Sequence, residues 1–361
     1  MSSEPELNEP KLDIEAMLDQ LSRANREREM VASKRPTASE LADALRQLAD
    51  LIYSGFDLER VDACTAKGLG PRDTYSWQPR AGSRAEEDVA FVEELLGTFV
   101  RDRDLVTLEF AETNPFRSSI VWGIGLLAQA VQTAVDHLHG IADSLESGRT
   151  IRAPLTMSRT VLEAAATGCF ISDATVDSRE RLRRAHNLRM EDMKEGANHR
   201  SDDENEDYLA GLDELVAFAT TCGFEVRRPR FSHSAPTIPP PNGEREAVRF
   251  LVERILPGVG LSTYRTLSTV AHCRPNVGDV LPDDYALPHE IDVWRKAEKI
   301  AWYVIPALVA VREMTERVAT YLGWDDHEIG TTIYQVLDFI SVGAGWKDAQ
   351  IREFLGLPPT S

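Results

Sequence analysis

Apolar residues recur three and four positions apart along most of the 361-residue chain, a spacing that is typical of amphipathic helices. No run alternates apolar and polar positions with β-branched residues, as a half-buried strand does; only 224–231 could pair as a short ribbon. The sequence therefore predicts an all-α protein. We expect a multi-helix bundle with an N-terminal helical extension and a short C-terminal helical pair.

Capping residues, glycines and prolines mark where the predicted helices begin and end. Ser83 and Glu86 have capping-box spacing, Asn114-Pro115 begins a helix that reaches about Leu145, and Pro306 should kink a long helix. The predicted helices cover residues 11–34, 38–53, 85–104, 116–145, 155–173, 177–196, 208–223, 244 onward with a break at 257–258, 261–273, 289–321, 325–342 and 346–355.

These helices group into three predicted regions. Residues 1–110 form an N-terminal helical region with a long loop rich in glycine and proline near 55–83. Residues 115–322 form the main bundle, and 323–361 form a C-terminal helical cap. Inside the bundle, 201–207 is an acidic link, and the proline density of 224–244 excludes regular structure there.

Charge and composition narrow the classes of function. A net charge of −19 argues against a broad electrostatic surface for DNA but leaves room for a local basic site. The four cysteines form no CxxC pair and are expected to be reduced thiols, as in a cytoplasmic protein. The longest apolar runs, 119–131 and 300–311, are shorter than the roughly 20 residues that a membrane-spanning helix needs.

Familiar metal and phosphate motifs are missing from the sequence. His137 and His139 are two positions apart, so in a helix they face different directions. There is no HExxH, no Glu-x-x-His pair of the di-iron kind and no GxxxxGK[ST] loop. The sequence therefore predicts neither a cofactor nor a metal site.

The stretch 261-LSTYRTLSTVAHCRPN-276 carries the candidate catalytic residues. On a helix, Tyr264, Ser268 and His272 share one face, and Arg265 precedes His272 by two turns. A hydrolase with Ser268 as nucleophile and His272 as base is disfavoured, because a serine in the middle of a helix more often bonds to the carbonyl four residues earlier.

Arg…His pairs with four to six residues between them also occur before His186, with Arg179 (six between) and with Arg181 (four between) as the arginine. Those pairs lie in the strongly charged segment 177–196, where a solvated helix face is expected. The helix around Arg265 is otherwise apolar, and arginine and histidine in such a setting need a partner.

Arg265-x6-His272, together with 158-SRTVLEAAATGCFISD-173 and the charged helix after it, resembles the HEPN superfamily (higher-eukaryote and prokaryote nucleotide-binding domain). The resemblance covers roughly 115–320. It implies an all-α, metal-independent endoribonuclease acting in bacterial stress or phage defence, with a site shared by two protomers of a homodimer. His272 would act as general base on an RNA 2′-hydroxyl, Arg265 would hold the phosphate, and Tyr264 and Ser268 would donate hydrogen bonds.

Alternatives stay open at this point. Active members of the superfamily often carry Asn, Asp or His directly after the arginine, and here that residue is Thr266. The chain would then be a catalytically silent helical scaffold or a protein-binding module, with a protein partner bound through the acidic N-terminal region. In that case Arg265 pairs with an acid such as Glu163, and His272 bonds to Ser268 or to a carbonyl. A small-molecule pocket in the bundle is a third alternative.

Overall fold

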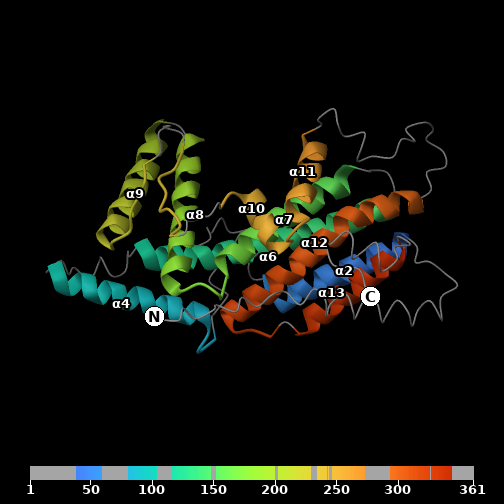
Figure 1. Ribbon diagram of the computed structural model, residues 1–361, viewed down its shortest axis with the longest axis horizontal. Helices are drawn as coiled ribbons and strands as arrows, with labels where there is room; N and C mark the ends of the chain where they lie inside the picture. The colour runs from blue at the N-terminus through green and yellow to red at the C-terminus, as the bar shows by residue number, and fades with distance from the viewer. Residues whose placement is uncertain are drawn as a thin grey trace, which may run out of the picture.

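The computed structural model describes residues 38–58, 80–103, 115–147, 152–199, 202–228, 234–241, 243, 246–272, 293–325 and 327–343. Within these ranges the chain forms ten α-helices and one isolated antiparallel bridge, Arg227–Thr237, so the predicted all-α class is confirmed (Figure 1). The helices are α2 (Ala38–Gly55), α4 (Arg84–Arg103), α6 (Pro115–Ser147), α7 (Arg152–Ile171), α8 (Ser178–Asn198), α9 (Asp202–Thr221), α10 (Val248–Ile255), α11 (Gly260–Ala271), α12 (Val293–Leu322) and α13 (His327–Gly343).

Most of the predicted helices are confirmed, with one correction to their bounds. The acidic link expected at 201–207 is wrong, because α9 already begins at Asp202. Acidic residues in the first turn of a helix are stabilised by the partial positive charge of its N-terminus, so this composition suits a helix start. The helices predicted at 11–34 and 346–355 lie outside the described residues.

Local capping follows the predicted chemistry at α4. The backbone N–H of Glu86 donates to the Ser83 hydroxyl (3.3 Å), and the Glu86 carboxylate accepts from the N–H of Gly82. In a complete capping box the glutamate accepts from the N–H of the cap residue, here Ser83; in this chain it accepts from the residue before it, so the arrangement is a close variant of the capping box. At α8 the Asp177 carboxylate accepts from the N–H of Glu180 (2.8 Å) and caps that helix in the same way.

Helix α7 lies at the centre of the bundle. It packs against α6 and α12, and α10 and α11 cover its remaining face. On the far side of α6, α2 packs between α6 and α13. The buried apolar side chains form one continuous core that runs from Leu41 on α2 to Ile340 on α13, so helices from all three predicted regions share it. Among the described helices, none combines the length and apolar character that crossing a bilayer requires.

Helices α8 and α9 form a hairpin that stands on α6 and α4 at one end of the bundle (Figure 1). The prediction that 177–196 presents a solvated charged face is wrong. Five of its basic side chains are buried instead: Arg181, Arg183, Arg184, His186 and Arg189. Carboxylates from other elements, together with Glu180 of α8 itself, make the burial of Arg181, Arg183 and Arg184 tolerable, because a buried charge requires a paired and hydrogen-bonded partner.

The clearest of these pairs joins α8 to α4. Nη2 of Arg181 lies 2.8 Å from Oδ1 of Asp88, and the two side chains are 3% and 2% exposed. The hydroxyl of Tyr321 on α12 donates to the other carboxylate oxygen (3.0 Å). Burial, together with the charge of Asp88, raises the pKa of Tyr321 well above its usual value, so the phenol stays protonated. Three helices therefore meet at one buried carboxylate.

His186 connects α8 to α6 and α9. Its Nε2 lies 3.1 Å from the carbonyl of Leu215, and its Nδ1 lies 2.9 Å from the hydroxyl of Ser119. Because a carbonyl only accepts, Nε2 carries the proton and Nδ1 accepts from Ser119. Burial lowers the pKa of His186 to about 4, so the imidazole is neutral at neutral pH.

The turn between α10 and α11 fixes the position of α11. Gly258 has a positive φ of 85°, and the carboxylate of Glu253 accepts from the N–H groups of Gly258 (2.9 Å) and Leu261 (2.6 Å). A Cβ on Gly260 would lie 2.5 Å from the carbonyl oxygen of Val252, closer than atoms can approach. Only glycine fits there, so the two short helices pack closely against each other.

Candidate functional site

The four candidate residues lie on α11 or at its end, on the side of the molecule where α11 crosses α7. Tyr264 and Ser268 are half-buried, and Arg265 is exposed. His272 is the C-cap residue of α11, and its side chain is also exposed. Neither Arg265 nor His272 is buried within the bundle, so solvent and solutes can reach both side chains.

Helix α7 brings two further side chains to this place, Arg159 and Glu163. They are one helical turn apart, and Nη2 of Arg159 lies 2.9 Å from Oε1 of Glu163. Nε of Arg159 donates to the same oxygen (3.0 Å). Both side chains are partly exposed, which distinguishes this ion pair from the buried pairs of α8.

Tyr264 connects α11 to this ion pair. Its hydroxyl donates to Oε1 of Glu163 (3.0 Å) and accepts a longer contact from Nη2 of Arg159 (3.5 Å). The Arg159 guanidinium also lies over the Tyr264 ring, 5.4 Å from its centroid. Burial lowers the pKa of Arg159, but Glu163 and the Tyr264 hydroxyl outweigh burial and raise it overall. The guanidinium is therefore a fixed positive charge.

His272 meets the same guanidinium. Nη1 of Arg159 lies 3.3 Å from Nε2 of His272. A guanidinium only donates, so this contact is a hydrogen bond when Nε2 is unprotonated. Arg159, Glu163, Tyr264 and His272 together are called the α7–α11 cluster below. It gathers a cation, a carboxylate, a phenol and an imidazole at a solvent-reachable crossing of two helices.

Two of the sequence candidates lie beside this cluster. Among the described residues the Arg265 side chain has no ion pair or hydrogen bond, and the alternative pairing of Arg265 with Glu163 is not formed. Glu163 is held by Arg159 and Tyr264 instead. Ser268 contributes its carbonyl, which accepts from the backbone N–H of His272 (3.0 Å) and closes the last turn of α11.

Sequence reasoning missed Arg159 and gave Glu163 only the role of a partner for Arg265. A signal was present, because both lie in the otherwise apolar run SRTVLEAAATG at a spacing of four residues. Opposite charges at this spacing share one helix face and attract each other. What the sequence does not contain is the crossing of α7 and α11, which brings that pair to Tyr264 and His272.

The histidines of α6 stand apart from the cluster. Nδ1 of His137 lies 2.8 Å from the carbonyl of Thr133, whereas Nε2 of His139 lies 3.3 Å from Asp50 on α2. The two side chains thus face different partners, as their spacing predicts. In the part of the chain that the structure describes, no three His, Cys, Asp or Glu side chains gather as metal ligands would.

Comparisons with known proteins supply no relative: no family model, no curated protein and no solved structure matches the chain. The α7–α11 cluster therefore has to be interpreted from its own chemistry.

Proposed function

We propose that the α7–α11 cluster is the active site of a HEPN-like, metal-independent endoribonuclease. The observation that carries the proposal is the position of Arg159, whose guanidinium lies between Glu163 and His272 at a solvent-reachable surface. A cation flanked by groups that exchange protons is what cleavage of a phosphodiester by an internal hydroxyl requires. The Arg265-x6-His272 resemblance implies the same reaction.

The proposed reaction uses the RNA 2′-hydroxyl as nucleophile. Nε2 of His272, which accepts from Arg159 in the free protein, accepts the 2′-proton once the guanidinium has turned to the phosphate. O2′ attacks phosphorus, and the bond from phosphorus to O5′ breaks, which leaves a 2′,3′-cyclic phosphate. Histidine suits this role because its ordinary pKa of about 6.5 lies close to neutral pH. Arg159 stabilises the charge that develops on the phosphoryl oxygens, since a planar guanidinium donates to two oxygens at once.

Tyr264 and Arg265 complete the proposed site. Tyr264 is the phenol of the cluster. Its proton points to Glu163 in the free protein, and when RNA binds the hydroxyl would turn to give that proton to the leaving O5′. Arg265 is exposed on the helix face that leads to His272 and offers a second guanidinium to the substrate phosphate. In a protein with a net charge of −19, these two arginines provide the local positive charge that RNA needs.

The direct test is cleavage of a single-stranded RNA by purified protein in the presence of EDTA. We expect His272→Ala to lower the rate by about 10²- to 10⁴-fold, the usual contribution of a general acid or base. His199→Ala is the matched control, because the His199 side chain is 76% exposed and lies at the end of α8, away from the cluster. It should cleave as fast as wild type.

Two outcomes would reject the proposal: wild-type protein that leaves the RNA intact, or His272→Ala protein that cleaves it at the wild-type rate. Either result would favour the alternative of a silent helical scaffold. In cells, the proposal predicts that expression of wild type slows bacterial growth and degrades RNA, as expected of a toxin-like effector in the cytoplasm. His272→Ala should do neither.

The resemblance also implies a homodimer, and we include it in the proposal. The exposed guanidinium of Arg265 is available to a second protomer placed across a two-fold axis. Light scattering coupled to size-exclusion chromatography should give twice the chain mass. If the protein is a monomer and still cleaves RNA, the proposed dimer is wrong, but the proposed chemistry of the α7–α11 cluster is unaffected.

A further inference from the structure

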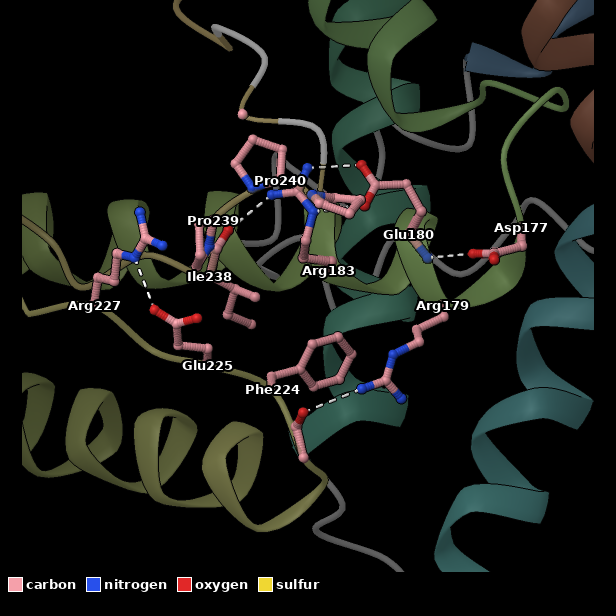
Figure 2. A pocket seen from close by; sticks show the side chains of 13 residues that line it. Asp177, Arg179, Glu180, Arg183, Phe224, Glu225, Arg227, Ile238, Pro239 and Pro240 are labelled. Carbon is pink, nitrogen blue, oxygen red and sulfur yellow. Dashed lines mark hydrogen bonds and ion pairs between the residues drawn. The ribbon is translucent and has the colours of Figure 1, made fainter.

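A groove lies between the N-terminal end of α8 and the two segments joined by the Arg227–Thr237 bridge (Figure 2). Its volume is about 840 Å³, within the range of pockets that bind small molecules. Phe224 and Ile238 supply buried apolar surface, Pro239 and Pro240 form a wall, and Arg179 lies at the rim. The groove thus combines apolar surface with a cation.

The walls of the groove are held in place before any ligand arrives. The N–H of Ile238 donates to the side-chain oxygen of Asn187, and its carbonyl accepts from Asn187 and from Arg183, all at 2.8–2.9 Å. The prolines that follow have a fixed φ. A groove with preformed walls binds a ligand without the entropic cost of ordering its own segments.

Most of the charge in the groove is already paired. Arg183 bonds to Glu180 and Glu246 and is nearly fully buried. Arg227 pairs with Glu225 at 2.9 Å, but these side chains are 65% and 70% exposed, so the pair contributes little and separates easily. With three arginines and three acids, the lining is neutral as a whole, which argues against a polyanion as the ligand.

Arg179 differs from the other two arginines that line the groove, because they pair with carboxylates and, within the described part of the chain, it does not. Its guanidinium stacks on Phe224, 4.2 Å from the ring centroid, and Nη2 donates to the carbonyl of Gly223 (3.3 Å). Gly223 has a positive φ of 77°, a conformation that places this carbonyl and that glycine adopts readily. Among the described residues, no carboxylate lies within ion-pair distance of Arg179.

A stacked, exposed arginine of this kind is a ready-made anion receptor. The fork of a guanidinium matches the oxygens of a phosphate or carboxylate, and the stack on Phe224 removes the freedom that a surface arginine normally loses on binding. Asp177 is the nearby acid that opposes an anion, but one of its oxygens is engaged in capping α8. The ligand therefore needs apolar contact as well as charge.

We propose that this groove binds a small organic anion, a phosphate or carboxylate joined to a flat apolar body. The anionic group pairs with Arg179, and the flat body lies against Ile238, Pro239 and Pro240. This proposal does not depend on RNA cleavage, because the groove and the α7–α11 cluster are built from different residues.

Isothermal titration of the full-length protein tests the proposal with a panel of simple probes. Phenyl phosphate and benzoate carry both features, whereas inorganic phosphate lacks the ring and benzyl alcohol lacks the anion. We expect each single-feature probe to bind at least about tenfold more weakly than a probe with both. Adenosine monophosphate distinguishes two classes of natural ligand. If it binds more tightly than benzoate, the ligand is a nucleotide; if benzoate binds more tightly, the ligand is an aromatic acid.

Two variants decide whether binding occurs at Arg179. Arg179→Gln should weaken phenyl phosphate about 10- to 100-fold, the value of one charge-assisted contact, and Arg179→Lys should weaken it less. Arg228→Gln is the control, since Arg228 is exposed, pairs with Asp213 and does not line the groove. Unfolding curves of each variant confirm that it folds. No binding of any probe to wild type, or equal binding by wild type and Arg179→Gln, would overturn the proposal.

Discussion

The guanidinium of Arg159 lies 3.3 Å from Nε2 of His272, although the two residues are 113 positions apart and belong to different helices. The contact exists because α10 and α11 fold back over the central helix α7. It brings the histidine that the sequence singles out to an arginine that the sequence does not single out. Arg159, rather than Arg265, is the arginine in contact with the imidazole.

This relationship predicts that Arg159 is needed for RNA cleavage. Arg159→Leu should lower the rate by about 10²- to 10³-fold, the loss expected when a donor to developing negative charge is removed. Arg159→Lys should retain part of the activity, because lysine keeps the charge but loses the planar fork. Arg84→Leu, on an exposed ion pair with Glu87, is the control for removing an arginine. Equal loss in both leucine variants would contradict the assignment.

The close packing of α10 and α11 predicts that Gly260 is needed to position the cluster. In Gly260→Ala the new methyl group would meet the carbonyl of Val252 at 2.5 Å, so α11 must shift. We expect a loss of about 1–3 kcal/mol in the free energy of unfolding, together with slower RNA cleavage. In Gly330→Ala the added methyl group meets nothing within 4 Å, so this change should leave both quantities close to wild type or raise stability slightly. Urea unfolding and cleavage assays measure the two effects.

The fold class was predictable from the sequence because helical spacing of apolar residues is a local property. The start of α6 at Pro115 and the capping box at Ser83 are equally local, and the structure has both. The buried face of α8 was not predictable in this way. Glu180 of α8 itself pairs with two of its arginines, but the further partners Asp88, Asp173 and Glu246 come from other elements, and only the tertiary fold brings those carboxylates close.

The same limit applies to the site. The sequence singled out Tyr264 and His272, and the structure places both beside Arg159. It named Arg265 for its spacing to His272 on an otherwise apolar helix, and neither feature says which neighbouring helix faces that arginine. Helix packing decides which side chain an exposed polar residue contacts. The packing that brings His272 to Arg159 joins residues more than a hundred positions apart, so no local pattern contains it.

The buried pair of Asp88 and Arg181 predicts a large effect on stability. Asp88→Ala leaves a guanidinium that is 3% exposed without its carboxylate, and such a loss costs about 3–5 kcal/mol. Glu87→Ala is the neighbouring control, because the Glu87 side chain is exposed and its pair with Arg84 should contribute no more than about 1 kcal/mol. Urea unfolding followed by circular dichroism gives both values. If both variants lose a similar free energy of unfolding, the buried pair contributes no more to stability than the exposed one.

His186 predicts a loss of stability in acid. Burial lowers its pKa from 6.5 to about 4, so the unfolded chain binds a proton more readily than the folded protein does. The contribution of neutral His186 is fully present above about pH 6.5 and disappears as the pH falls to about 4, a change of about 3 kcal/mol. Wild type should lose that much more stability over this range than His186→Gln. His199→Gln, at an exposed histidine, should follow wild type, and parallel curves for wild type and His186→Gln would contradict the prediction.

The chemistry of the cleaved RNA ends tests the central claim most directly. A 5′-labelled RNA and the same RNA with one 2′-deoxynucleotide at the cleavage position are incubated with wild type in EDTA, and the products are analysed by mass spectrometry. If the α7–α11 cluster activates the 2′-hydroxyl, the RNA yields a 2′,3′-cyclic phosphate and a 5′-hydroxyl, the deoxy substrate stays intact at that position, and His272→Ala yields neither product. Cleavage of the deoxy substrate, or products that end in a 3′-hydroxyl, would contradict the account.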